Sequence, residues 1–132
     1  MKNLFLLLTL ILFVNCTTEE TKKTIDITGK WEAIEKMEIP DASYDRVWTA
    51  IDKSHRFYLY FNDSNYQRIN YDSSISCNGS YDVFPVENDW FALNLLCNSV
   101  HQQNRCKFEN GFLIIEGWEC IEYCAYKFSK TE

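Results

Sequence analysis

The sequence has few residues that break regular structure and little positive charge. Four Gly and two Pro among 132 residues exclude a collagen-like or low-complexity chain. Only two His are present, which leaves little room for a histidine-rich metal site. Lys and Arg number 13 against 19 Asp and Glu, and a net charge of −6 disfavours nucleic-acid binding, which needs a basic face. No apolar run approaches the roughly 20 residues of a membrane-spanning helix.

Aromatic and apolar side chains are abundant instead. Nine Phe, eight Tyr and four Trp make up 16% of the chain, and 46% of the residues are hydrophobic. This composition predicts a folded chain rather than a disordered one. The length predicts a single domain.

The first residues have the pattern of a secretory signal peptide. Lys2 supplies a positive start, and residues 4–14 form an apolar run that only Thr9 interrupts. The run has the length of a signal-peptide core, about 7–15 residues. The polar residues that follow lack Leu, Phe and Val, which is typical of a flexible tether. The expected organisation is a signal peptide (1–15), a tether (16–24) and a folded domain (25–132).

The apolar run ends at Cys16, and Phe13-Val14-Asn15-Cys16 resembles the lipobox of bacterial lipoproteins. In that family the cysteine is diacylated and the signal is cut directly before it. The resemblance implies a lipoprotein that fatty chains such as palmitate hold in a membrane of the bacterial cell envelope, with the outer membrane favoured, on its periplasmic or surface side. Two or three chains on one residue give a stable anchor, whereas one chain does not. The alternatives are an ordinary signal peptide with an incidental Cys16 and an uncleaved N-terminal anchor.

Turn signals separate short segments in which apolar side chains occupy every second position. The Asn-Gly pairs at 78–79 and 110–111 are the strongest of these signals. About eight short strands with hairpin-length links predict an all-β fold, as an antiparallel up-and-down barrel or a sandwich. The large candidates for the interior of a barrel are Phe57, Leu59, Phe61, Phe91, Leu93, Ile114 and Phe128.

One segment departs from the strand pattern. Tyr44, Val47, Trp48 and Ile51 recur at the spacing of a helical stripe. The spacing predicts a short helix over residues 42–53, directly after the first strand. The alternative is a strand through residues 46–51.

The start of the body resembles the lipocalin family. Gly29-Lys30-Trp31 opens the first strand, and Gly-x-Trp at this place is similar to the N-terminal motif of lipocalins. Residues 77–81 and 120–128 look like those of small bacterial lipocalin-like lipoproteins. The resemblance implies an up-and-down barrel in which Trp31 closes the floor and Gly29 allows a close backbone approach. The chain departs from the family in its short body and in having no long helix after the last strand.

The cysteines after Cys16 fit an oxidising compartment, where thiols pair. We expect one bridge between Cys97 and Cys106, across a polar loop, and a second between Cys120 and Cys124, across a three-residue turn. Cys77 would then keep a free thiol. The alternative is a metal site built from the four expected bridge cysteines. We expect no metal and no other cofactor.

No catalytic motif stands out, so an enzyme is not expected. His55 and His101 fall in different expected elements, as solvated surface residues. Glu116, Glu119 and Glu122 cluster, and paired carboxylates can hydrolyse sugars when held about 5–10 Å apart. Solvent-facing positions on a hairpin are the favoured interpretation of this cluster.

Two functions from different classes fit such a barrel. In the first, the anchored barrel binds a small hydrophobic ligand in or at its mouth, against the interior candidates and Trp48. Trp31, Trp90 and Trp118 could line the same pocket or fill the core. In the second, a solid barrel binds a protein, as an enzyme inhibitor or a subunit of an envelope complex, because Tyr is enriched at interfaces. The contact face would consist of Tyr58, Tyr60, Tyr66 and Tyr71. A cavity of about 300 Å³ or more would favour the first function.

Overall fold

The computed structural model describes residues 24–38, 46–117 and 124–132. In this part of the chain there are nine antiparallel strands and one short 3-10 helix at Lys53–His55. None of the described helical segments has the length and apolarity to cross a membrane. The strands are β1 (Gly29–Glu38), β2 (Val47–Ala50), β3 (Phe57–Asn62), β4 (Asn65–Asn70), β5 (Ile75–Pro85), β6 (Phe91–Cys97), β7 (Val100–Glu109), β8 (Phe112–Glu116) and β9 (Ala125–Lys130).

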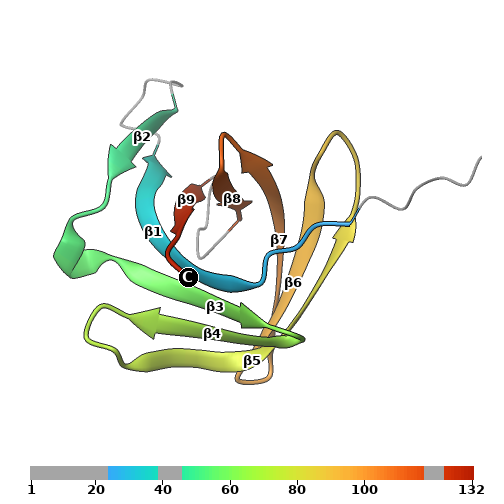
Figure 1. The fold of residues 1–132 in the computed structure, drawn as a ribbon, viewed down its shortest axis with the longest axis horizontal. Coiled ribbons are helices and arrows are strands. Elements are labelled where there is room, and N and C mark those ends of the chain that lie inside the picture. Colours follow the sequence, from blue (N-terminus) through green and yellow to red (C-terminus); the bar gives the residue numbers. More distant parts are fainter. Residues whose placement is uncertain (1–23, 39–45, 118–123) are drawn as a thin grey trace, which may run out of the picture.

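Eight of these strands close into a barrel. β3 to β9 pair in chain order, and β1 pairs with both β3 and β9, which closes the circuit (Figure 1). β2 pairs only with Glu35–Glu38 of β1 and lies outside the circuit. The expected all-β fold, an antiparallel up-and-down barrel of about eight strands, is confirmed.

The predicted helix over residues 42–53 is wrong for its described part. Val47–Ala50 is a strand, and helical structure is limited to the single turn at Lys53–His55. Residues 42–45 lie outside the described residues. The helical spacing fails because its members do not share a surface: Val47 is 47% exposed, whereas Ile51 is buried. Backbone hydrogen bonding to β1 decides the structure here instead.

Two-residue turns join β3 to β4, β6 to β7 and β7 to β8, and one Asn-Gly signal marks such a turn. Asn110 and Gly111 both have positive φ and link β7 to β8. The other pair is no turn, because Asn78 and Gly79 lie inside β5. At Gly79 the carbonyl oxygen of Leu96 on β6 is so close that a Cβ would lie only 1.6 Å from it. The glycine therefore permits close approach of two strands rather than a reversal of the chain.

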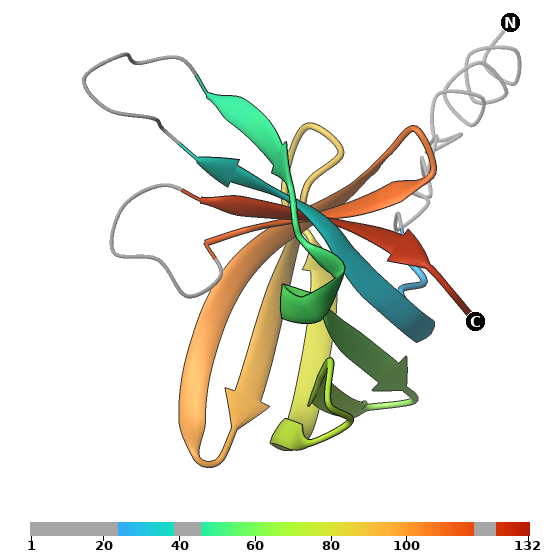
Figure 2. The ribbon, with the colours of Figure 1, turned by 90° about the vertical axis from the view of Figure 1, so that its left-hand side faces the viewer.

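The first described segment (blue), the C-terminus and the β7–β8 hairpin lie at the same end of the barrel, at the right of Figure 2. We call this the N-terminal end and the opposite one the far end. At the N-terminal end the buried Trp31 donates a hydrogen bond from Nε1 to the carbonyl oxygen of Ile27, at 2.9 Å. Its ring lies 5.6 Å from that of Phe108, centroid to centroid. Gly29 has φ +117°, and a Cβ on it would lie 2.5 Å from the carbonyl oxygen of Glu132.

The disulfide pairing differs from the expected one. Cys77 and Cys97 are bonded, with Cα atoms 5.6 Å apart, and Cys106 is the buried free cysteine. The expected bridge between Cys97 and Cys106 is wrong because residues between them form strand rather than loop. Only Asn98 and Ser99 make the turn, with φ of 48° and 68°. Cys97 therefore lies opposite Val100, and Cys106 lies opposite Phe91, at the other end of the same strand pair.

Cys77 is accordingly not the free thiol that the sequence suggested. Cys124 is also disulfide-bonded. Its expected partner Cys120 lies outside the described residues, as does Cys16.

Candidate functional site

The barrel interior is filled by the side chains that were expected to line a ligand pocket. Six of the expected residues are buried in the core: Phe57, Leu59, Phe61, Phe91, Leu93 and Phe128. Their exposed fractions run from 0 to 6%. A side chain with almost no accessible surface borders no space that a water molecule could enter. The interior around these residues is therefore a packed core rather than a cavity.

Two of the expected lining residues lie elsewhere. Ile114 alternates with the inward-facing Leu113 and Ile115, so it faces the outer wall, where it lies between Lys107 and Lys127. Trp48 lies on β2, outside the barrel circuit, with the ammonium of Lys127 4.6 Å from its ring centroid. Neither contributes to an interior pocket.

The predicted tyrosine face is also split. Tyr60 and Tyr71 are exposed, but Tyr66 is 1% exposed and stacks on Phe61 with ring centroids 5.5 Å apart. The short β3–β4 turn places Tyr66 directly opposite Phe61, which points into the core. Tyr66 cannot contact a partner together with the other tyrosines.

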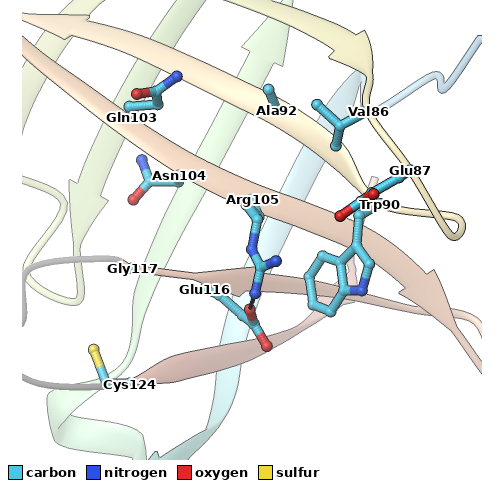
Figure 3. Close-up of a pocket in the computed structure, with 10 residues that line it drawn as sticks. All are labelled: Val86, Glu87, Trp90, Ala92, Gln103, Asn104, Arg105, Glu116, Gly117 and Cys124. Atoms are coloured by element: carbon cyan, nitrogen blue, oxygen red, sulfur yellow. Dashed lines mark hydrogen bonds and ion pairs between the residues drawn. The ribbon is translucent and has the colours of Figure 1, made fainter.

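A groove on the outer wall is the most suitable place for a ligand. It has a volume of about 750 Å³, and Figure 3 shows the residues that line it. We call it the side groove. Its lining comes from the β5–β6 turn, from β6, β7 and the end of β8, and from the residues directly after β8 and before β9. It consists of Val86, Glu87, Trp90, Ala92, Gln103, Asn104, Arg105, Glu116, Gly117 and Cys124.

Strand register assembles the middle of the side groove. Ala92 on β6 lies opposite Arg105 on β7, and Arg105 lies opposite Glu116 on β8. Strands in a sheet are about 4.8 Å apart, so this row extends roughly 10 Å across the wall. Ala92 is the smallest side chain in the row, which leaves space beside Trp90.

Two cations hold the indole of Trp90 in place. The guanidinium of Arg105 and the ammonium of Lys107 each lie 4.9 Å from its ring centroid. Arg105 Nη2 also donates a hydrogen bond of 2.6 Å to Glu116 Oε2. The groove thus combines a rigid aromatic wall with an internally neutralised ion pair.

Asn104 adds an unusual polar group to the lining. Among the described residues it is the one buried side chain that carries an amide or a charge, with 4% exposed. Its Nδ2 has no hydrogen-bond partner in the part of the chain that the structure describes. Gly117 lies next to it: a Cβ there would be 3.5 Å from Asn104 Oδ1. Asn104 lies opposite the core residue Leu93 on β6 and alternates with the core residue Cys106 on its own strand, so its position faces the barrel interior.

The far end of the barrel holds a smaller and more polar hollow, of about 260 Å³. It is lined by Tyr66, Arg68, Asn70, Ser76, Gln102 and the Cys77–Cys97 disulfide. The guanidinium of Arg68 lies 4.2 Å from the ring centroid of Phe57 and so covers the apolar core. This is the barrel mouth, and it offers little apolar surface for the hydrophobic ligand that the sequence suggested.

The residues considered for catalysis make local contacts. His55 Nδ1 lies 3.2 Å from Ser54 Oγ, and that hydroxyl donates to Asp52 Oδ1 at 2.5 Å. Asp52 also accepts from the Ser54 backbone, which caps the 3-10 turn; these bonds lower the pKa of its carboxyl group. His101 is exposed on β7. Glu116 pairs with Arg105, whereas Glu119, Glu122 and Trp118 lie outside the described residues.

Within the described ranges, no three His, Cys, Asp or Glu side chains gather into a possible metal site. Sequence analysis had considered Trp90 for a pocket but missed Asn104. The pattern that could have revealed Asn104 is a polar residue at an inward position of a strand. It was missed because residues 98–105 were interpreted as a loop. Comparison with known proteins finds no match to the chain among family models, curated proteins or solved structures.

Proposed function

We propose that this protein is a lipid-anchored lipoprotein of the bacterial cell envelope whose lipocalin-like barrel binds a small, largely apolar ligand in the side groove. The signal-peptide pattern, Cys16 at its end and the polar tether support the anchor. The described chain begins at residue 24, the last residue of the expected tether.

One observation carries the binding function: the core is filled, and a groove of about 750 Å³ lies on the outer wall. Ligand sites in proteins usually measure about 300–1,000 Å³, with an apolar lining and a few polar groups that orient the ligand. Trp90, Ala92 and Val86 supply the apolar part, and the exposed Gln103 and Arg105 supply the polar part. Binding in the side groove replaces the expected binding in the barrel interior.

Native mass spectrometry of the mature protein, extracted from its own envelope in mild detergent, tests the binding function. We expect the wild-type protein to retain a small molecule. Ala92→Trp fills the groove and should release it, whereas Tyr60→Ala, on an exposed position of β3, should leave it bound. A protein that co-purifies and is lost with Tyr60→Ala would instead support a protein-binding surface.

The anchor has a separate test. Cys16→Ser should abolish labelling with radioactive palmitate and move the protein out of the membrane fraction. Unchanged labelling and fractionation would contradict the anchor and leave the side groove unaffected.

A further inference from the structure

We infer that the outward face of the β5–β6 hairpin contacts the membrane beside the proposed anchor, and that the contacted lipid is a zwitterionic phospholipid. The inference rests on the proposed lipid anchor. It goes beyond the anchor because it assigns a second, noncovalent contact with the bilayer to particular side chains. We call the outward side chains of this hairpin the hairpin face; they are Phe84, Val86, Trp90 and Ala92.

Strand register places these four side chains on one surface. Phe84 on β5 lies opposite Ala92 on β6. Ala92 lines the outer wall and Val83 packs against the core, so Phe84 points outward. A backbone hydrogen bond of 3.1 Å from the Val86 nitrogen to the Trp90 carbonyl oxygen continues the pairing beyond the two strands. Val86 and Trp90 also line the side groove (Figure 3), so the hairpin face is continuous with its apolar part.

The hairpin face leaves large apolar side chains in water. Phe84 is 42% exposed and Val86 is 51% exposed. Apolar side chains that stand together on an outer wall indicate a contact with a partner or a membrane. Trp90 between them is half-buried, and Trp is enriched where membranes meet water because its ring is apolar and its N–H is polar. The composition of the hairpin face is therefore that of a membrane-interface contact.

The hairpin face lies at the end of the barrel where the described chain begins. Phe91 is paired with Cys106, so β6 starts beside the last residues of β7, next to the β7–β8 hairpin. The first described segment lies at this N-terminal end (Figure 2). Residue 24 is eight positions after Cys16, and eight residues span at most about 29 Å. The proposed anchor therefore keeps the N-terminal end, rather than the far end, close to the bilayer.

The charges beside the hairpin face determine which lipid fits. The guanidinium of Arg105 and the ammonium of Lys107 each lie 4.9 Å from the ring centroid of Trp90, and such groups bind lipid phosphates. Both cations also pair with carboxylates on β7 and β8, so this border has no net positive charge. Glu87 in the turn is exposed, and the whole chain has a net charge of −6. A surface of net negative charge would be repelled, whereas a zwitterionic one offers phosphates without that repulsion.

Fluorescence quenching by brominated lipid tests the contact. The mature lipidated protein is placed in vesicles of phosphatidylcholine brominated on its acyl chains, where bromine quenches tryptophans that touch the bilayer. We expect quenching of the wild-type protein relative to vesicles without bromine. Trp90→Phe should remove most of it. No quenching of the wild-type protein, or equal quenching in Trp90→Phe, would overturn the inference.

Two matched variants locate the contact on the barrel. Val86→Asp puts a charge on the hairpin face and should reduce the quenching about twofold or more, because carboxylates avoid apolar lipid. Val100→Asp is the control, since Val100 is also exposed, at 58%, but starts β7 at the far end. It should leave the quenching unchanged. Both positions are exposed, so both variants should keep the thermal unfolding midpoint of the wild-type protein. Equal quenching in the two variants would contradict the hairpin face.

Lipid composition and flotation complete the test. Phosphatidylglycerol added to the vesicles should not increase the quenching, and an increase would contradict the charge argument. Flotation of the vesicles reports the anchor separately. A protein that does not float with the vesicles contradicts the anchor together with the inference. A protein that floats without quenching contradicts only the inference, and a change of its oligomeric state in Val86→Asp would then assign the hairpin face to a second copy of the chain.

Discussion

Replacement of Trp31 by Ala should be among the most destabilising single changes in the barrel. Trp31 is 3% exposed, contacts the core and lies 5.6 Å from Phe108. Truncation to Ala removes about 150 Å² of buried apolar surface, worth about 4 kcal/mol at 25 cal/mol per Å². The carbonyl oxygen of Ile27 also loses the indole N–H that now bonds to it at 2.9 Å, which adds about 1 kcal/mol.

Urea unfolding followed by circular dichroism measures this loss. We expect the free energy of unfolding to fall by about 3–5 kcal/mol, the usual range for a buried Trp→Ala change. Small domains have about 5–15 kcal/mol in total, so the midpoint should drop sharply. Trp31→Phe keeps a ring in the core and should lose less. Tyr71→Ala, at a position that is 57% exposed, should change stability by less than about 0.5 kcal/mol.

A loss below about 1 kcal/mol for Trp31→Ala would refute the reasoning. It would mean that Trp31 is not part of the core in solution. The comparison of Gly29-Lys30-Trp31 with lipocalins would then lose its structural basis.

Three further changes have defined outcomes. Peptide mapping without reduction should recover Cys77 linked to Cys97, and a Cys97–Cys106 peptide would contradict this pairing. Replacing both Cys77 and Cys97 by Ser should lower the free energy of unfolding by about 3 kcal/mol, because the bridge closes a loop with a sequence separation of 20. Burial raises the pKa of Cys106 to about 12 from 9.0, so the native state holds this proton more tightly, and the free energy of unfolding should fall as pH rises above about 9. Cys106→Ala should reduce that fall, and equal slopes in both proteins would exclude the thiol as its cause. Gly29→Ala should destabilise the barrel by at least 1 kcal/mol in thermal unfolding, because φ is +117° and a Cβ would strike the last residue of the chain; an unchanged midpoint would show that the C-terminal contact is dispensable.

Alternation was enough to predict the barrel because it depends only on neighbouring residues. On β3, Phe57, Leu59 and Phe61 face the barrel core, as their alternate spacing indicated. Local patterns failed where contacts between strands decide. Asn78-Gly79 resembles a hairpin turn in sequence, yet Gly79 lies inside β5 and its missing side chain lets β6 pack close to it. Val47 and Ile51 have helical spacing, yet pairing with β1 makes the segment between them a strand.

The cysteine error has the same origin. Asn98 and Ser99 form the β6–β7 turn without a glycine, so the sequence does not show where the chain reverses. Because the turn lies there, residues 100–105 belong to β7. Cys106 and Cys97 therefore lie at opposite ends of the β6–β7 strand pair. The same register brings Ala92, Arg105 and Glu116 into one row. Because this two-residue turn could not be recognised in the sequence, neither the disulfide pairing nor the row of groove residues could be predicted.

The sizes of the side chains explain why the groove lies outside the barrel. Inward positions carry large residues such as Trp31, Phe61 and Phe128, which leave no room for a ligand. Across β6 to β9, outward positions include Ala92 and Ala125, and both are buried although neither belongs to the core cluster. Small side chains on a wall leave a hollow only where larger neighbours border it, as Trp90 borders Ala92. In this barrel, large residues fill the interior and small residues lie on one wall, so the groove lies on the outer surface rather than in the interior.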